Sequence, residues 1–187
     1  VDYKSSKRDL DIGEVYYGVL RNGQEVAIKI RRYRIEEVFH KDFITLRMVF
    51  WLLKILTNLG KKADLKALYH ELVFVMEREL NYHQEVEFGN YFKERYKDME
   101  NIHIPIFYEN LCTKRVIVME WIHGEKVTNA AFYKQHQLNR EHISRSIFEF
   151  YIDQFLNPGK FHADPHAGNI LVRSDGKVAN IDFGMVG

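Results

Sequence analysis

Three polar side chains near the end of the chain have the types and the order that phosphoryl transfer from ATP requires. Asp164 and Asn169 lie in one segment, His-Ala-Asp-Pro-His-Ala-Gly-Asn, and Asp182 opens the triplet Asp-Phe-Gly. An aspartate placed like Asp164 orients the attacking hydroxyl or accepts its proton. The oxygens of Asn169 and Asp182 are hard ligands that suit Mg²⁺ bridging the phosphates of ATP. The pattern therefore predicts a catalytic loop followed by a metal-binding loop.

A lysine early in the chain has the surroundings of a phosphate-binding lysine. Lys29 ends the strand-like run Val-Ala-Ile-Lys, which in kinases places the lysine over the α- and β-phosphates. Ala27 leaves space that a larger side chain would take from the adenine ring. Alone, Lys29 would be interpreted as a surface lysine on an edge strand. Together with the three residues of the catalytic and metal-binding loops, it predicts a nucleotide site.

A phosphate-binding lysine needs an acid that holds it extended, and two glutamates on one expected helix are candidates. Glu79 and Glu85 are six residues apart, so on a continuous helix they would lie about 240° apart and could not both point at Lys29. We expect Glu85 to pair with Lys29 and Glu79 to be a second acid that faces the cleft. The alternative for both is a solvated helix position, which most glutamates occupy.

A buried strand that runs towards a glycine has the character of a kinase hinge. Residues 116–124 read Val-Ile-Val-Met-Glu-Trp-Ile-His-Gly. The backbone at Glu120 and Ile122 is expected to hydrogen-bond the edge of an adenine, and Met119 is expected to limit the depth of the pocket. The alternative is a core strand followed by a turn, because this motif is weak by itself.

The elements that must position these residues follow from hydrophobic periodicity, turn residues and caps. Asn22-Gly23 between two β-rich runs predicts a hairpin, after which apolar residues recur at helical spacing. Asp64 and Asn139 each precede a helical pattern and can cap it. The expected elements are strands 15–20 and 25–30, helices 35–59, 64–76 and 79–92, strands 104–108 and 115–120, helix 140–156, and a hairpin of 170–172 with 178–181.

This order of elements predicts an α+β fold of the protein-kinase type. We expect about residues 1–122 to form an N-lobe, an antiparallel sheet with a helical insertion, and about residues 123–187 to form the first part of a helical C-lobe. A nucleotide would lie in the cleft between them. The 187 residues, 46% of them hydrophobic, suffice for a core. Because the chain ends directly after the Asp-Phe-Gly triplet, we expect it to be a fragment of a larger protein, truncated there.

Composition and charge exclude several classes of protein. The net charge of +1 gives no general attraction to nucleic acid, and the single cysteine, Cys112, excludes an internal disulfide framework. No signal peptide is visible at the start. The longest apolar run, residues 43–59, contains Arg47 and Lys54, which argues against a transmembrane helix. For this run a helix packed into the lobe is favoured over a helix lying in a membrane interface.

Longer motifs give a specific resemblance. Glu-x-Asn-Tyr-x-x-Glu, Val-Met-Glu-Trp-Ile-x-Gly, Phe-His-Ala-Asp-Pro-His-x-Gly-Asn-Ile-Leu-Val and Ile-Asp-Phe-Gly-Met-Val-Gly resemble the UbiB (AarF-type, ABC1-like) family of atypical protein-kinase-like proteins. The similarity runs from Gly13 to Gly187 and includes a helical insertion between Lys29 and Glu85 that ordinary protein kinases lack. It implies ATP and Mg²⁺ as cofactors, ATPase or unorthodox kinase activity, and a link to isoprenoid quinone (ubiquinone-like) biosynthesis or lipid homeostasis at a membrane.

The resemblance also implies residue roles, partners and a location. Besides ATP, the implied partners are a membrane lipid or quinone intermediate and quinone-biosynthesis proteins, without nucleic acid. The implied location is the cytoplasm, peripherally at the inner face of a membrane. The expected catalytic residues are Asp164, Lys29, Glu85 and Glu79, the metal ligands are Asn169 and Asp182, and the nucleotide contacts are Gly13, Val15, Ala27, Lys29, Met119, Glu120, Ile122 and Leu171.

The chain departs from the family pattern at three places. Asn81 stands where the family's Glu-x-Asp motif has its second acid, which removes a charge near the phosphates. The alanine-rich nucleotide loop is replaced by Arg-Asp-Leu-Asp-Ile-Gly at residues 8–13, of which only Gly13 matches the end of the loop. The family's Lys-x-Gly-Gln segment, which covers the active site, is absent from this chain.

Two further functions stay open from the sequence. A small-molecule phosphotransferase of the aminoglycoside or choline kinase type shares the His-x-Asp-x-x-x-x-Asn loop, although the helical insertion and the motif at residues 79–81 argue against it. A catalytically weak ATP-binding scaffold is suggested by the altered loop at residues 8–11 and by Asn81. Turnover of an amino-alcohol or aminoglycoside would favour the first of these, and ATP binding without ADP release would favour the second.

Overall fold

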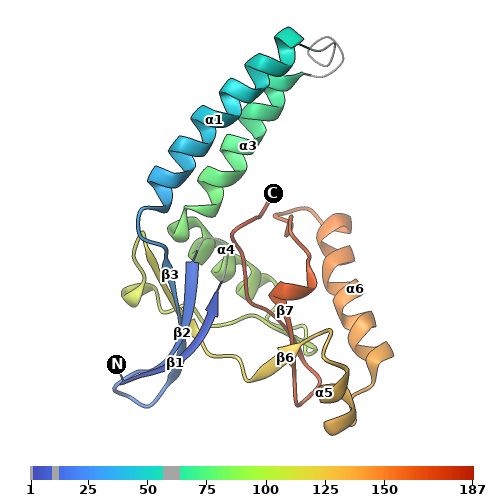
Figure 1. Cartoon of the computed structure of the whole chain (residues 1–187). Coiled ribbons are helices and arrows are strands. Elements are labelled where there is room, and N and C mark those ends of the chain that lie inside the picture. The colour runs from blue at the N-terminus through green and yellow to red at the C-terminus, as the bar shows by residue number, and fades with distance from the viewer. Residues whose placement is uncertain (1, 10–12, 57–63) are drawn as a thin grey trace.

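The computed structural model describes residues 2–9, 13–56 and 64–187, and of residues 2–9 and 79 it describes only the backbone (Figure 1). Two small sheets and the helices around them give an α+β architecture. The strands are β1 (Asp2–Asp9), β2 (Gly13–Val19), β3 (Glu25–Arg31), β4 (Ile102–His103), β5 (Val116–Glu120), β6 (Gly124–Lys126), β7 (Ile170–Arg173) and β8 (Val178–Asn180). The helices are α1 (Ile35–Leu56), α3 (Leu65–Glu79), α4 (Tyr82–Arg95), α5 (Ala130–Gln135) and α6 (Arg140–Leu156), with short 3₁₀ turns η1 (Glu109–Leu111) and η2 (Ala167–Asn169).

The first sheet is antiparallel and has the strand order β1-β2-β3-β5. The turn between β2 and β3 contains Gly23 at φ 85°, a left-handed conformation that glycine adopts without strain. The register of this hairpin places Val15 beside Lys29, and on the other side of β3 Lys29 pairs with Ile117. Lys29 is therefore held in the middle of the sheet, between two strands. The expected hairpin of strands 15–20 and 25–30 is confirmed.

The second sheet has the order β4-β8-β7-β6, with β4 parallel to β8 and the other pairs antiparallel. The expected hairpin of 170–172 with 178–181 forms its centre. The strand expected over residues 104–108 is wrong: β4 ends at His103, and only Phe107 makes an isolated bridge, to Met119. Pro105 has no N–H to contribute to a ladder, which keeps this segment from forming a strand.

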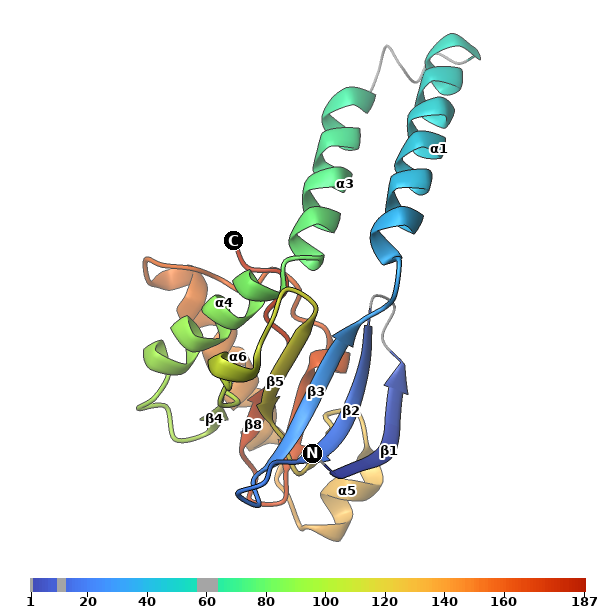
Figure 2. The same ribbon diagram turned by 90° about the vertical axis from the view of Figure 1, so that its left-hand side faces the viewer.

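The helical insertion, α1 and α3, is a hairpin that extends away from the sheets (Figures 1 and 2). Asp64 caps α3 as expected, accepting from the backbone N–H groups of Lys66 and Ala67. No residue of α1 is buried, so the expectation that this apolar run packs into the lobe is wrong. Its exposed apolar side chains are Val38, Ile44, Met48, Val49, Trp51, Leu52, Ile55 and Leu56. Among the described residues no helix has both the length and the apolar character needed to cross a membrane.

A single helix was expected from residue 79 onwards, but the structure has two helices here: α3 ends at Glu79 and α4 begins at Tyr82. Asn81 is the N-cap of α4, because its side-chain oxygen accepts from the backbone N–H of Gln84. Glu79 closes α3 and Glu85 lies in the first turn of α4, so the two acids belong to different helices. The expected separation of Glu79 and Glu85 by about 240° around one continuous helix therefore does not apply.

The cap makes Asn81 a stability determinant of α4. We expect Asn81→Ala to lower the free energy of unfolding by about 1 kcal/mol, because an orphan N–H of the first turn loses its acceptor. Asn81→Asp should keep the stability, since a carboxylate accepts the same bond and also suits the positive end of the helix dipole. Urea denaturation of the three proteins measures this, and equal stability of Asn81→Ala and the natural chain would contradict the capping role.

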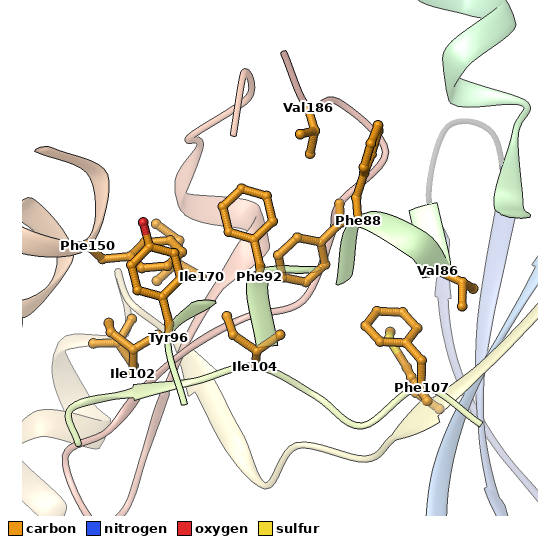
Figure 3. Packing of buried hydrophobic residues seen from close by; sticks show 14 of the residues in the cluster. Val86, Phe88, Phe92, Tyr96, Ile102, Ile104, Phe107, Phe150, Ile170 and Val186 are labelled. Atoms are coloured by element: carbon orange, nitrogen blue, oxygen red, sulfur yellow. The ribbon is translucent and has the colours of Figure 1, made fainter. Parts of the chain in front are cut away.

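The core lies between α4, α6 and the second sheet, and it is rich in aromatic rings (Figure 3). Phe92 of α4 is fully buried, with its ring centroid 5.5 Å from that of Phe183 and 6.3 Å from that of Phe150. Phe183 also lies 6.1 Å from Phe107. Since Phe183 directly follows Asp182, these ring contacts hold the backbone of the Asp-Phe-Gly triplet against the core.

Candidate nucleotide and metal site

A buried cluster of three charged side chains joins β3, α4 and the Asp-Phe-Gly triplet. Lys29 Nζ lies 2.7 Å and 2.9 Å from the two carboxylate oxygens of Glu85, and 3.2 Å from Asp182 Oδ2. Lys29 is 8% exposed and Glu85 3% exposed, while the side chain of Asp182 keeps 24% of its surface. The structure thus brings together residues from both ends of the chain, and Glu85 holds the lysine extended across the sheet.

Burial and charge oppose each other in this cluster. Burial alone would lower the pKa of Lys29, but the carboxylates of Asp182 and Glu85 outweigh it and raise that pKa above its ordinary value. Burial would likewise raise the pKa of Asp182, but the nearby Lys29 ammonium and the Gly184 N–H hold it below its ordinary value. Lys29 therefore stays a cation and Asp182 an anion, which are the forms that phosphate and metal binding require.

Asn169 and Asp182 come from neighbouring points of the β7–β8 hairpin. Ile170 pairs with Asn180, and the Ile181 N–H donates to the Asn169 carbonyl at 3.0 Å, so the residue before β7 lies opposite the residue after β8. Asn169 is 8% exposed, and within the described ranges its side chain makes no hydrogen bond. The side-chain amide oxygen is therefore free to act as a ligand.

The donor set fits a magnesium ion shared with a nucleotide. Within the part of the chain that the structure describes, no group of three or more His, Cys, Asp and Glu side chains could hold a metal alone. Asn169 and Asp182 supply hard oxygen donors, and Mg²⁺ is commonly held by one or two such side chains together with substrate phosphates and water. These two residues could hold the ion only jointly with a phosphate ligand.

His162 connects the catalytic loop to the metal-binding loop. Its Nδ1 accepts from the backbone N–H of Asp164 at 3.2 Å, and its Nε2 lies 2.7 Å from the carbonyl of Asp182. The two bonds require a neutral ring with the proton on Nε2. Burial lowers the pKa of His162, which favours this form. His162 was not among the site residues expected from the sequence. Its place in the His-x-Asp motif, two residues before Asp164, was the signal that could have indicated it.

Asp164 is accessible to solvent, which a residue that contacts a phosphoryl acceptor needs. Its side chain is 42% exposed, and its Oδ2 lies 3.4 Å from His166 Nε2. His166 Nδ1 in turn accepts from the Gly168 N–H at 3.0 Å, so the loop is tied to itself through this ring. A Cβ on Gly168 would lie 2.6 Å from that ring, so a larger residue there would push the His166 side chain aside.

The residues expected around an adenine lie on β3, β5, the segment after β5, and β7. Ala27 pairs with Met119 across the sheet, and both are 5% exposed. Ile122 and Leu171 belong to one small apolar cluster that also contains Ala179. Ala27 and Met119 belong instead to the main core cluster, so the structure places the expected adenine contacts in two separate apolar clusters.

The hinge backbone is only partly free to bind a base. The Glu120 N–H donates to the Ile106 carbonyl at 2.8 Å, and the Glu120 carboxylate is held by His103 at 2.9 Å. Its carbonyl, rather than its N–H, is the group left to meet an adenine amine. Within the described ranges the Ile122 N–H has no acceptor, so it can donate to the ring.

The phosphate-loop side of the site is described in part. Gly13 begins β2, and Val15 packs in part against the main core. Residues 10–12 and the side chain of Glu79 lie outside the described residues, so the expectations for the altered loop and for Glu79 as a second acid remain predictions. Gly13 lies close to Tyr82, a residue that was not assigned from the sequence: a Cβ built on Gly13 would be 2.8 Å from Tyr82 Oη.

Comparisons with known proteins agree with this geometry. Residues 11–187 match the ABC1 atypical kinase-like domain. An uncharacterized protein of Synechocystis, sll0005, is 34% identical over 176 residues, which make up 94% of this chain and 26% of that protein. Protein ACTIVITY OF BC1 COMPLEX KINASE 1, chloroplastic, of Arabidopsis thaliana is 36% identical over 178 residues, again 94% of this chain and 26% of that protein.

A solved structure, the complex of Rv3197 with erythromycin from Mycobacterium tuberculosis, has a TM-score of 0.77 and 28% identity; the match covers 98% of this chain and 46% of that one. The chain thus spans about a quarter of the length of the two curated relatives and about half of the solved one. The α+β fold of the kinase type is confirmed by this likeness.

Proposed function

The chain belongs to the family of ABC1 atypical kinase-like domains, and from this premise we propose that it binds ATP with Mg²⁺ and transfers or hydrolyses the γ-phosphoryl group. The observation that carries the proposal is the buried contact of Lys29 with Glu85 and Asp182. In phosphoryl transfer a lysine held by a glutamate neutralises phosphate charge, and an aspartate beside it serves the metal. The same three types of residue, in the same order, meet here.

Each side chain has a separate task in this proposal. Lys29 binds the α- and β-phosphates while Glu85 keeps it extended. Asn169 and Asp182 hold Mg²⁺, which when bound neutralises charge on the phosphates. Asp164 orients the attacking hydroxyl or water. His162 holds the backbone of the catalytic loop, at Asp164, to the backbone of the metal-binding loop, at Asp182. Glu79 is proposed as a further acid at the cleft.

Release of ADP from ATP by the full-length protein tests the reaction. We expect slow, Mg²⁺-dependent turnover, with the label of γ-labelled ATP found in inorganic phosphate or in an acceptor. Binding of ATP without ADP release over hours would favour the scaffold function instead. Efficient turnover of an amino-alcohol or an aminoglycoside, independent of lipid, would favour a small-molecule phosphotransferase.

The wider role that we propose is in isoprenoid quinone biosynthesis or lipid homeostasis, with a lipid or quinone intermediate and quinone-biosynthesis proteins as partners. The support for this role is family membership. The proposed location is the cytoplasm, at the inner face of a membrane. Lipid chromatography of cells that lack the protein tests this role: we expect a lower amount of the quinone or a changed amount of its precursors.

The α1–α3 hairpin supports the membrane part of the proposal. Its distal half exposes Met48, Trp51 and Leu52. The charged residues nearest to them in the sequence, Arg47 and Lys54, are both basic and exposed. Apolar side chains flanked along one helix by basic ones suit an anionic membrane surface, where burial of the apolar residues and attraction to lipid phosphates add together.

We expect the full-length protein to float with vesicles that contain anionic lipid and to float less at high salt, since salt screens the basic residues. The double variant Trp51→Ser, Leu52→Ser should lose most of this binding. Phe155→Ser is the matched control, because Phe155 is 69% exposed on α6, away from the hairpin. Absence of flotation for the natural protein, or equal flotation of the double variant, would contradict a membrane contact through this hairpin.

A further inference from the structure

Tyr82 carries a hydroxyl group that the fold buries and does not use. It is the first residue of α4, is 1% exposed, and its Oη is fully buried without a hydrogen-bond partner in the described part of the chain. A buried hydroxyl without a partner costs free energy, so such groups are rare and call for an explanation. The helix does not need this hydroxyl, because Asn81 caps it.

The hydroxyl lies between the phosphate-binding lysine and the start of β2. The Tyr82 ring centroid is 5.3 Å from Lys29 Nζ. A Cβ built on Gly13 would lie 2.8 Å from Tyr82 Oη, and 3.0 Å from the Ile30 carbonyl oxygen. The backbone of Gly13, at the end of the expected phosphate loop, therefore lies next to the phenol hydroxyl, and Lys29 Nζ lies over the face of the Tyr82 ring.

Packing alone does not explain a tyrosine at this place. Phenylalanine would fill the same volume and contact Lys29 with the same ring face, without a polar atom to bury. Other buried tyrosines use their hydroxyls: Tyr96 donates to Asp153 and Tyr133 donates to the Val127 carbonyl. Tyr151 on α6 is the other described tyrosine with a buried, unpaired hydroxyl.

We propose that Tyr82 is a nucleotide-binding residue, whose hydroxyl donates a hydrogen bond to a phosphate oxygen of a nucleoside di- or triphosphate. Burial raises the pKa of Tyr82 to about 12, so the phenol remains a protonated donor at neutral pH. The Gly13 backbone, which lies against Oη, has to move aside for a phosphate oxygen beside Lys29 to reach the hydroxyl. This inference rests on the proposed function, because it presupposes a nucleotide at Lys29.

The test is Tyr82→Phe in the full-length protein, with ATP, ADP and adenosine as the titrated ligands. We expect affinity for ATP and ADP to fall about tenfold or more, since a bond from a hydroxyl to a charged acceptor is lost. Affinity for adenosine should not change, and the thermal midpoint without ligand should stay the same or rise. Tyr133→Phe is the control: it removes a bonded hydroxyl far from Lys29 and should lower the midpoint without affecting ATP.

Three results would overturn the inference. Equal ATP and ADP affinity of Tyr82→Phe and the natural protein would make Tyr82 a packing residue and leave the proposed function standing. A folding defect of Tyr82→Phe would show that the hydroxyl already has a structural partner. Absence of nucleotide binding by the natural protein would remove the proposed function, and this inference with it.

Discussion

Replacing Asp182 by asparagine is expected to lower the rate of ATP turnover by about 10²-fold or more, because phosphoryl transfer depends on charge stabilisation and positioning. The substitution removes the negative charge that serves the metal and keeps the shape of the side chain. Lys29 keeps both oxygens of Glu85, at 2.7 Å and 2.9 Å, so the cluster retains a partner for the buried cation. The loss should therefore appear in kcat rather than in folding.

Asp175→Asn is the matched control for this prediction. Asp175 lies in the turn at the other end of the same hairpin, where its 42% exposed side chain pairs with Arg173 at 3.2 Å. Exposed pairs of this kind contribute about 0–1 kcal/mol to stability. We expect its turnover to equal that of the natural protein. Full Mg²⁺-dependent turnover by Asp182→Asn would contradict the assignment of the metal site.

The second large effect is expected from Glu85→Gln. It leaves Lys29 buried with Asp182 at 3.2 Å as its remaining acidic partner. Removing one partner of a buried ion pair costs about 3–5 kcal/mol, because the other charge stays desolvated. We expect a loss of unfolding free energy near the lower end of this range in urea denaturation, together with weaker ATP binding, since the lysine is no longer held extended.

Glu87→Gln is the control on the same helix, since Glu87 is 73% exposed and lies 3.8 Å from Lys160. It should change stability by less than about 1 kcal/mol. The double variant Lys29→Met, Glu85→Gln separates structure from function. It should regain part of the stability, because it buries no unpaired cation, and it should remain unable to turn over ATP. A stability of Glu85→Gln equal to that of the Glu87 variant would contradict a tightly coupled buried pair.

Local sequence signals predicted much of the fold. Asn22-Gly23 gave the β2–β3 hairpin, and Asp64 and Asn139 cap α3 and α6 as expected. Such features depend on residues close together in the chain. Strand β1, strand β6 and helix α5 were not predicted, since they are short or lack an alternating or helical apolar pattern of their own.

Two expectations were wrong because local pattern does not determine tertiary contact. The apolar face of α1 predicted burial, but periodicity shows only that a face is apolar and not what covers it. A single helix was expected over residues 79–92, whereas α3 ends at Glu79 and Asn81 caps the separate helix α4. A polar residue with a short side chain followed by a helical run is equally an N-cap signal.

The candidate site was predicted as a set of residues, and the structure adds how they meet. The proximity of Lys29, Glu85 and Asp182 depends on the packing of α4 against both sheets, which spacing alone does not determine. His162 and Tyr82 were missed. Their importance follows from partners on other elements: the Asp182 carbonyl for His162, and Lys29 and Gly13 for Tyr82.

The central claim is that Lys29, Asn169 and Asp182 form a site for ATP with Mg²⁺, and titration calorimetry of the full-length protein with ATP tests it most directly. The titration is run with Mg²⁺ and again with excess EDTA. We expect saturable binding with Mg²⁺ that weakens at least about tenfold in EDTA, because Asn169 and Asp182 can contribute only through the ion. No binding in either buffer, or binding that neither EDTA nor Asp182→Asn weakens, would contradict the claim.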